Sequence, residues 1–182
     1  AKKVGCKIRG ITISPSQLEF AKSRIKKQGL EDKVSLDLCD YRDLKGQYDR
    51  VVSIEMIEAV GEKYWIDYFK KIKEVLTKDG MAGIQVILIN NKSYERYSKS
   101  VDFIHENYKK SGLREVQSSS FGQSYAKTLE IWHKDFINSI KSIRQLGFDH
   151  RLERLFKYYF SYCKAGFNSK KIDVVQKIIK SA

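Results

Sequence analysis

The first half of the chain alternates short strand-like runs with helix-like stretches, and this order constrains the fold more than any other feature. The runs rich in β-branched and other apolar residues cover residues 7–12, 34–38, 49–54 and 81–89. One helical stretch begins at Ser14 and a second covers residues 62–77. Strands and helices that alternate at such spacings are typical of a doubly wound α/β sheet. We therefore predict an α/β fold.

The two expected helices differ in how clearly the sequence marks their ends. Ser14 is placed as an N-cap, with Pro15 at the first helical position and Gln17 completing a capping box, and Gly29 ends the helix. The second helix has an apolar face made of Trp65, Phe69, Ile72 and Leu76. A turn at residues 79–80 is expected to lead into the strand 81–89. The run 49–54 is apolar enough to predict a strand buried in a parallel sheet.

The second half of the chain has a different character. Residues 114–121 and 172–179 are typical of strands, and residues 125–145 and 149–166 of two helices rich in aromatic and aliphatic side chains. One face of the later helix carries Leu152, Phe156, Tyr159, Phe160, Cys163 and Phe167. In sheets of the predicted kind, ligands lie outside the carboxyl ends of the strands. That rule points to residues 12–17, 40–42 and 55–61.

The net charge of +13 limits the possible partners. Three explanations fit this charge: the protein binds nucleic acid, it is attracted to anionic lipid, or it comes from an organism whose proteins are generally rich in lysine. A nucleic-acid face requires a dense basic stripe with interleaved aromatics, whereas these lysines are dispersed among acids, so we favour an anionic membrane surface and expect no nucleic-acid partner. The three cysteines form neither a disulfide framework nor a CxxC site, which favours a cytoplasmic protein. His105, His133 and His150 lack ligand spacing, so no metal is expected.

Several ordered segments resemble motifs of the cyclopropane fatty acid synthase and mycolic acid cyclopropane synthase family of class I S-adenosylmethionine-dependent methyltransferases. Residues 49–61 (DRVVSIEMIEAVG) resemble its post-strand motif, and residues 10–17 (GITISPSQ) its second cofactor loop. Residues 121–132 resemble its FGxxYxxTLxxW segment, residues 158–167 its YYLxxCxxxF helix, and residues 172–176 its closing strand. The family's fold is a Rossmann-like sheet with helical additions over an acyl site, which makes residues 1–182 one catalytic domain.

The resemblance implies S-adenosylmethionine as cofactor, S-adenosylhomocysteine as its product, and a bound bicarbonate ion. The residues expected to contact the ribose or methionine part of the cofactor are Thr12, Ile13, Ser14, Pro15, Ser16 and Gln17. Tyr41 and Arg42 are expected to flank the adenine, where Tyr41 offers a stacking face. The alternative is that Ser14 and Gln17 only cap a helix.

The resemblance also implies a catalytic set made of Glu58, Gln85, Tyr125 and Cys163, which would hold the bicarbonate. A carboxylate such as Glu58 repels an anion unless the two share a proton. The alternative interpretation of Glu58 is an ordinary carboxylate in a surface loop. Gln85 needs hydrogen-bond partners if it is buried and otherwise faces solvent, while Tyr125 is either an anion donor or a core residue. Cys163 is expected to orient bicarbonate through its S–H group and not to act as a nucleophile; the alternative is an inert core thiol.

The implied reaction is cyclopropanation of the cis double bond in an unsaturated phospholipid acyl chain. A carbocation forms on the chain and bicarbonate removes a proton, which requires a dry pocket that aromatic side chains would line. The alternatives are a related enzyme that makes methyl-branched lipids or methylates an amine, and a non-catalytic basic binding module. We expect a peripheral association with the membrane surface and allow for a homodimer.

Two motifs of the family are missing from the residues given. Its glycine-rich GxGWGG loop would precede Ala1, and its FPxG segment would follow residues 102–104. The passage from His105-Glu106 into Asn107 is also short for the elements around it. We therefore expect the full protein to contain an N-terminal glycine-loop segment and an internal segment near residues 106–107.

Overall fold

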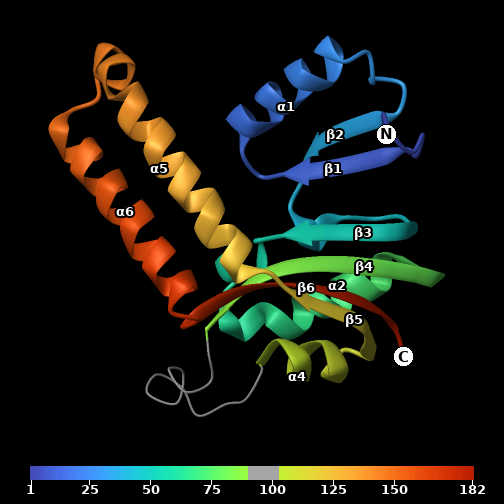
Figure 1. The fold of residues 1–182 in the computed structure, drawn as a ribbon. Helices are drawn as coiled ribbons and strands as arrows, with labels where there is room; N and C mark the ends of the chain where they lie inside the picture. The colour runs from blue at the N-terminus through green and yellow to red at the C-terminus, as the bar shows by residue number, and fades with distance from the viewer. Residues whose placement is uncertain (90–102) are drawn as a thin grey trace. The chain divides into compact units, whose positions relative to one another are not determined.

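The computed structural model describes residues 1–89 and 103–182 (Figure 1). The chain divides into two compact units, Ala1–Tyr48 and Asp49–Ala182, and each unit is treated by itself below. None of the helices in the described residues is both long and apolar enough to cross a membrane.

The first unit is a βαβ element. Strands β1 (Ile8–Thr12) and β2 (Val34–Leu38) pair in parallel, with Thr12 opposite Leu38, and helix α1 (Pro15–Lys27) connects them. A single 3-10 turn, η1 (Tyr41–Asp43), follows β2. Both strands therefore end at the same edge, and the segments after them meet there (Figure 1).

The predicted start of α1 is confirmed, and its capping box is only half formed. Ser14 is the N-cap, and its hydroxyl accepts a hydrogen bond from the Gln17 amide at 3.3 Å, with Pro15 in the first turn. The Gln17 side chain does not accept from the Ser14 amide, as a full capping box would require. Its Oε1 accepts from the Thr12 hydroxyl at 3.0 Å instead, and the Ser14 amide donates to that same hydroxyl at 3.1 Å. Gly29 ends the helix with a φ of 60°, a conformation that favours glycine.

The second unit contains a four-stranded sheet in the order β3-β4-β6-β5. Its strands are β3 (Tyr48–Ile54), β4 (Leu76–Ile89), β5 (Leu113–Ser120) and β6 (Ile172–Ser181). Strand β6 runs antiparallel to both of its neighbours, with a register shift between Glu115 and Gln117 of β5. The predicted strands and the α/β class are thus confirmed.

The helices of this unit fall into two groups. Helices α2 (Trp65–Val75) and α4 (Phe103–Lys110) pack against each other below the sheet, after the short turns η2 (Ile57–Ala59) and η3 (Glu62–Tyr64) (Figure 1). Helices α5 (Gly122–Gln145) and α6 (His150–Asn168) form a hairpin that extends from one end of the sheet (Figure 1). Helix α4 is continuous through residues 106–107. The segment expected before Ala1, the FPxG motif expected after residues 102–104 and the internal segment expected near residues 106–107 all stay predictions.

The core of this unit forms where the apolar face of α2 meets α4 and the sheet. Tyr68, Phe69, Ile72 and Val75 recur at the spacing of one helix face and are all buried. The ring of Phe69 lies edge-on to that of Tyr108 on α4, with centroids 6.0 Å apart. Two of the candidate catalytic residues belong to this sheet: Gln85 lies on β4, and Glu58 follows β3.

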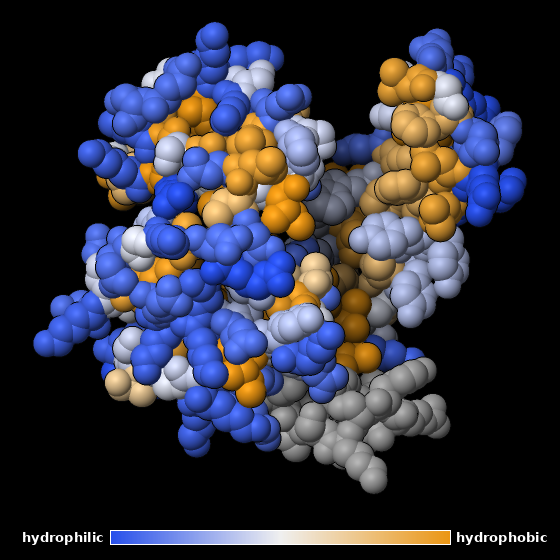
Figure 2. Space-filling view, turned by 180° about the vertical axis from the view of Figure 1, so that it is seen from behind, coloured by the Kyte–Doolittle hydropathy of each residue, from blue (hydrophilic) through white to orange (hydrophobic). Residues whose placement is uncertain are grey.

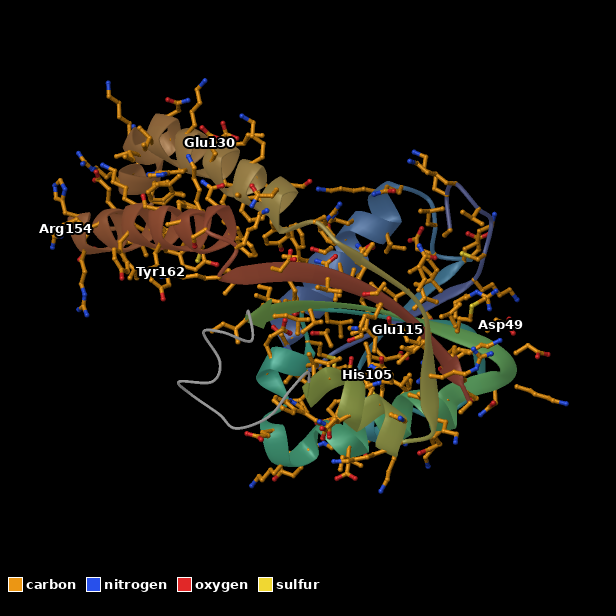
Figure 3. The ribbon with its side chains drawn as sticks, turned by 60° about the horizontal axis from the view of Figure 1, so that its bottom comes forward. Asp49, His105, Glu115, Glu130, Arg154 and Tyr162 are labelled. Atoms are coloured by element: carbon orange, nitrogen blue, oxygen red, sulfur yellow. The ribbon has the colours of Figure 1, made fainter. Side chains whose placement is uncertain are left out.

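A polar network with two buried members, Tyr108 and Lys177, joins α4, β5 and β6; Figure 3 labels its His105 and Glu115. The Lys177 side chain on β6 is buried and its ammonium donates to Glu115 on β5 at 2.7 Å. Tyr108 also donates to Glu115, at 2.9 Å, and its hydroxyl contacts His105 Nδ1 at 2.7 Å. Burial raises the pKa of the Glu115 carboxyl, but the hydrogen bonds from Lys177 and Tyr108 outweigh it and hold this pKa below its usual value.

Two details of the sequence prediction are wrong. The expected turn at residues 79–80 is absent, because α2 ends at Val75 and Leu76 already has the extended backbone that begins β4. Leu76 and Gly80 are both buried in that strand. The burial expected for β3 also fails at Val52 and Ile54, which are 71% and 61% exposed, because they share one face of the strand with the exposed Arg50 while Val51 and Ser53 take the other.

Candidate functional site

The predicted cofactor residues gather at the carboxyl end of the strands in the first unit. The Thr12, Ser14 and Gln17 side chains form the linked hydrogen bonds described above, and the Ser14 and Ser16 hydroxyls lie 3.1 Å apart. Ile13 is 76% exposed, and Pro15 begins α1. The loop therefore presents several hydroxyl groups and an amide together, and the Cys39 amide fixes it to the segment after β2 by donating to the Thr12 carbonyl at 2.9 Å.

The segment after β2 is fixed by an ion pair. Asp40 caps η1 by accepting from the Arg42 amide, and it also accepts from the Arg42 guanidinium at 2.9 and 2.6 Å. These hydrogen bonds lower the pKa of Asp40 to about 2 and raise the pKa of Arg42. Tyr41 lies in the same turn, so the structure places the predicted adenine-flanking pair at the same strand edge as the loop 12–17.

The predicted catalytic residues lie in the second unit, and the structure brings three of them close together. Glu58 follows β3, and its Oε1 accepts a hydrogen bond from the Ile87 amide of β4 at 2.9 Å. Gln85 lies two residues before Ile87 on the same strand. Tyr125 lies in the first turns of α5 and is half-buried against the cluster of Ala126, Phe160 and Phe167.

A residue not included in the predicted set lies at the centre of this group. The Glu55 carboxylate accepts from the Gln85 amide at 2.9 Å and from the Tyr125 hydroxyl at 2.5 Å, both at Oε1. The Glu55 backbone amide donates to the Gln85 carbonyl at 2.9 Å. Gln85 in turn accepts from the Gln176 side chain of β6 at 2.9 Å. Side chains of β4 and α5 thus converge on one carboxylate that directly follows β3, and a side chain of β6 fixes the one from β4.

The backbone at Glu55 is itself unusual. Its φ of 50° lies in the left-handed region, shared by only one other non-glycine residue of the described chain, Lys170. Such a conformation costs on the order of 1–3 kcal/mol in a residue that carries a Cβ, and it persists only where surrounding contacts enforce it. The backbone and side-chain hydrogen bonds between Glu55 and Gln85 supply that enforcement.

The electrostatics of the cluster are those of two carboxylates near a phenol. Burial, together with the hydrogen bond to Glu55 and the charges of Glu55 and Glu58, raises the pKa of Tyr125 to about 12. Tyr125 therefore keeps its proton across the physiological range and acts as a donor. Among the described residues, no Lys, Arg or His forms an ion pair with either carboxylate.

Cys163 approaches this group through an aromatic neighbour. It is half-buried on α6 against the same apolar cluster that contacts Tyr125. Partial burial, the neighbouring Cys163 to which it is hydrogen-bonded, and the charge of Glu55 raise the pKa of Tyr159. The structure thus links Cys163 to the cluster by way of Tyr159, and its predicted contact with bicarbonate stays a prediction. Within residues 1–89 and 103–182, no group of three potential ligands is arranged to hold a metal ion.

Sequence reasoning missed two of these residues, Glu55 and Gln176, and expected Tyr159 only on the aromatic face of its helix. All three lie inside segments that carried the family resemblance, but only the spatial contacts separate them from their neighbours. For Glu55 the one available signal was its position directly after a strand, where ligands lie in sheets of this kind.

Comparison with solved structures identifies the fold. The chain superposes on mycolic acid cyclopropane synthase CmaA1, solved with S-adenosylhomocysteine and CTAB, with a TM-score of 0.85 at 18% identity, covering 96% of this chain and 70% of that one. The fold is that of the S-adenosylmethionine-dependent methyltransferases.

The particular family follows from the sequence. Residues 1–107 and 97–177 match the family of mycolic acid cyclopropane synthetases, and the chain belongs to it. Tuberculostearic acid methyltransferase UfaA1 of Mycobacterium tuberculosis is 34% identical over 94% of this chain and 44% of its own length. Cyclopropane-fatty-acyl-phospholipid synthase of Escherichia coli is 30% identical over 92% of this chain and 45% of its own. The chain thus spans less than half the length of these two curated relatives.

Proposed function

We propose that the protein transfers a methyl group from S-adenosylmethionine to the cis double bond of an unsaturated phospholipid acyl chain. The observation that carries this proposal is the convergence of Glu55, Glu58, Gln85 and Tyr125 in the second unit. Carboxylates without a cationic partner stabilise a positive charge that develops on a substrate, and alkene methylation creates such a charge. The names of the two relatives, a tuberculostearic acid methyltransferase and a cyclopropane-fatty-acyl-phospholipid synthase, support the same chemistry.

The residues at the strand edge of the first unit fit the proposed cofactor. The hydroxyls of Thr12, Ser14 and Ser16 and the amide of Gln17 suit the ribose hydroxyls and the amino acid group. The Tyr41 ring suits the adenine. When bound, the cofactor supplies an electrophilic methyl group on a sulfonium. The residues here would bind and orient it, together with the glycine-rich loop expected in the full protein.

The residues of the second unit would do the remaining work. Glu55 and Glu58 stabilise the carbocation formed on the acyl chain, and the aromatic rings of Tyr125 and Tyr159 present further electron density to it. The apolar cluster behind them, which includes Phe160 and Phe167, excludes water that would otherwise trap the cation. A base must then remove a proton. The family resemblance implies bicarbonate for that step, held by Glu58, Gln85, Tyr125 and Cys163, and a carboxylate of the protein itself is the other candidate.

The product follows from which proton leaves. Loss from the transferred methyl group with ring closure gives a cyclopropane, which the resemblance favours. The higher identity to the tuberculostearic acid methyltransferase supports the second candidate, in which the proton leaves the acyl chain and a methyl-branched chain that keeps a double bond results. Methylation of an amine is a third possibility and has less support, because both relatives are named for work on fatty acyl chains.

We further propose that the substrate is reached at an anionic membrane surface, on the cytoplasmic side. The α5–α6 hairpin supports this, because apolar side chains gather along it in Figure 2. Its exposed apolar residues include Leu146, Phe148, Leu155 and Tyr162, the last 66% exposed. Arg154 lies on α6, as Leu155 and Tyr162 do (Figure 3). The net charge of +13 adds general attraction to anionic lipid.

The proposal is tested with the full-length protein, S-adenosylmethionine and vesicles that contain an unsaturated phospholipid. We expect the acyl chains to gain the mass of one methylene, and Cys163→Ser to retain cofactor binding by calorimetry while losing turnover. Labelled methyl on a small amine with unchanged lipid would contradict the proposal. Absence of cofactor binding in the full-length protein would instead favour a non-catalytic binding module.

A further inference from the structure

The structure points to a base that belongs to the protein itself. Two donors that the family resemblance assigns to bicarbonate, the Gln85 amide and the Tyr125 hydroxyl, both donate to Glu55 Oε1. A carboxylate and a bicarbonate share the same planar O–C–O group and accept hydrogen bonds in the same way. The Glu55 side chain therefore uses the hydrogen bonds that would otherwise hold an exogenous anion.

The charge of the cluster disfavours a further anion. Glu58 is engaged by the Ile87 amide, and both Glu55 and Glu58 act on the Tyr125 phenol through their charges. Among the described residues, neither carboxylate has an ion-pair partner to offset it. A bicarbonate ion beside two unpaired carboxylates would meet repulsion from both, and the hydrogen bonds that could offset this repulsion already go to Glu55.

The backbone of Glu55 indicates that its position is enforced. A left-handed φ of 50° at a glutamate is strained, and a glycine there would avoid the strain. The amide of Glu55 is nonetheless tied to the Gln85 carbonyl at 2.9 Å, and its side chain to the Gln85 amide at the same distance. These two hydrogen bonds to Gln85 fix the orientation of the Glu55 side chain, and therefore the direction of its second carboxylate oxygen, Oε2.

We propose that the Glu55 carboxylate is the general base of the reaction, in place of bicarbonate. This inference rests on the proposed function. The alkene π electrons bond to the methyl carbon as the carbon–sulfur bond breaks and the sulfur keeps that electron pair. Glu55 then takes a proton from the transferred methyl group, and the released C–H electrons close the ring onto the cationic carbon. The protonated Glu55 later returns the proton to solvent, so the step needs no other reactant.

The first test compares turnover with and without bicarbonate. In buffer freed of carbon dioxide, wild-type turnover on unsaturated vesicles is expected to stay unchanged, because the base is built in. Glu55→Gln is expected to lower kcat at least about 100-fold, the lower range for loss of a general base, with the lipid KM within about threefold. Glu55→Gly should recover part of its turnover when formate or bicarbonate is added. Glu130→Gln, an exposed change on α5, serves as the matched control and should retain full turnover.

The second test reads the anion site without turnover. Carbon-13 bicarbonate is added to the wild-type protein and to Glu55→Gly, and line broadening reports binding. We expect binding to Glu55→Gly and none to wild type. Wild-type turnover that falls without bicarbonate, or bicarbonate binding to wild type that Tyr125→Phe removes, would overturn the inference.

The two tests separate the failure of this inference from failure of the proposed function. If wild type methylates no lipid, the proposed function fails, and the binding comparison still decides whether Glu55 takes the place of the anion. If wild type is active and Glu55→Gln is equally active, the proposed function stands and the base assignment is wrong.

Discussion

The hydrogen bond from Tyr125 to Glu55 provides a measurable test of the cluster. Tyr125→Phe removes one hydroxyl that donates to a carboxylate at 2.5 Å and leaves Glu55 with Gln85 alone. A hydrogen bond to a charged group contributes about 1.5–3 kcal/mol, and the half-buried site places this one near the lower value. We expect the free energy of unfolding to fall by about 1.5 kcal/mol, or the Tm by about 3–6 °C for a chain of this size.

The assay is urea unfolding of wild type, Tyr125→Phe and the control Tyr158→Phe, whose ring is 65% exposed and which should change stability by less than about 0.5 kcal/mol. The stabilising contribution of Tyr125 should also depend on pH. The folded pKa of Tyr125 is raised from 10.0 to about 12, so its contribution is present below pH 10 and is lost as the pH rises towards 12. Equal stability of Tyr125→Phe and wild type at pH 8 would refute the hydrogen bond, as would a phenol that titrates near 10.

Three further changes test other parts of the fold. Glu115→Gln leaves the buried Lys177 without its charged partner and should cost about 2–3 kcal/mol in urea unfolding; a cost below about 0.5 kcal/mol would contradict the pairing. The pKa of Glu153 is lowered from 4.5 to about 2 by basic neighbours, so wild type should lose stability relative to Glu153→Gln as the pH falls from 4.5 towards 2, and parallel acid-unfolding curves would contradict this. Gly122→Ala places a Cβ 2.5 Å from an Asp173 carboxylate oxygen and 3.2 Å from its Cα, so the Tm should fall by several degrees, and an unchanged Tm would show that this contact relaxes freely.

The sequence predicted the elements well where local chemistry determines them. The start of α1 followed from Ser14 and Pro15, because an N-cap hydroxyl and a fixed φ act within a few residues. The two aromatic helices and the last strand followed from their apolar spacing. The end of α2 did not, since Leu76 fits a helix face by spacing and enters β4 through pairing that only the folded sheet reveals.

The candidate site was predicted only in part, for a similar reason. Gln85 and Tyr125 could be placed by motif, and the structure joins them. The acceptor that joins them is Glu55, which lies three residues before the predicted Glu58 in the same motif. Spacing along the chain could not decide between the two carboxylates, because their roles depend on a left-handed backbone at Glu55 and on contacts from β4 and α5.

The central claim is cyclopropanation in which the transferred methyl group loses a proton to the Glu55 carboxylate, and one measurement tests it most directly. The full-length protein is given S-adenosylmethionine with a fully deuterated methyl group and vesicles of an unsaturated phospholipid, and the deuterium in each modified acyl chain is counted by mass spectrometry. We predict product chains that keep two of the three deuterium atoms and have lost the double bond, with the yield abolished in Glu55→Gln. Chains that keep all three deuterium atoms, or lipid that stays unlabelled while the cofactor is consumed, would contradict the claim.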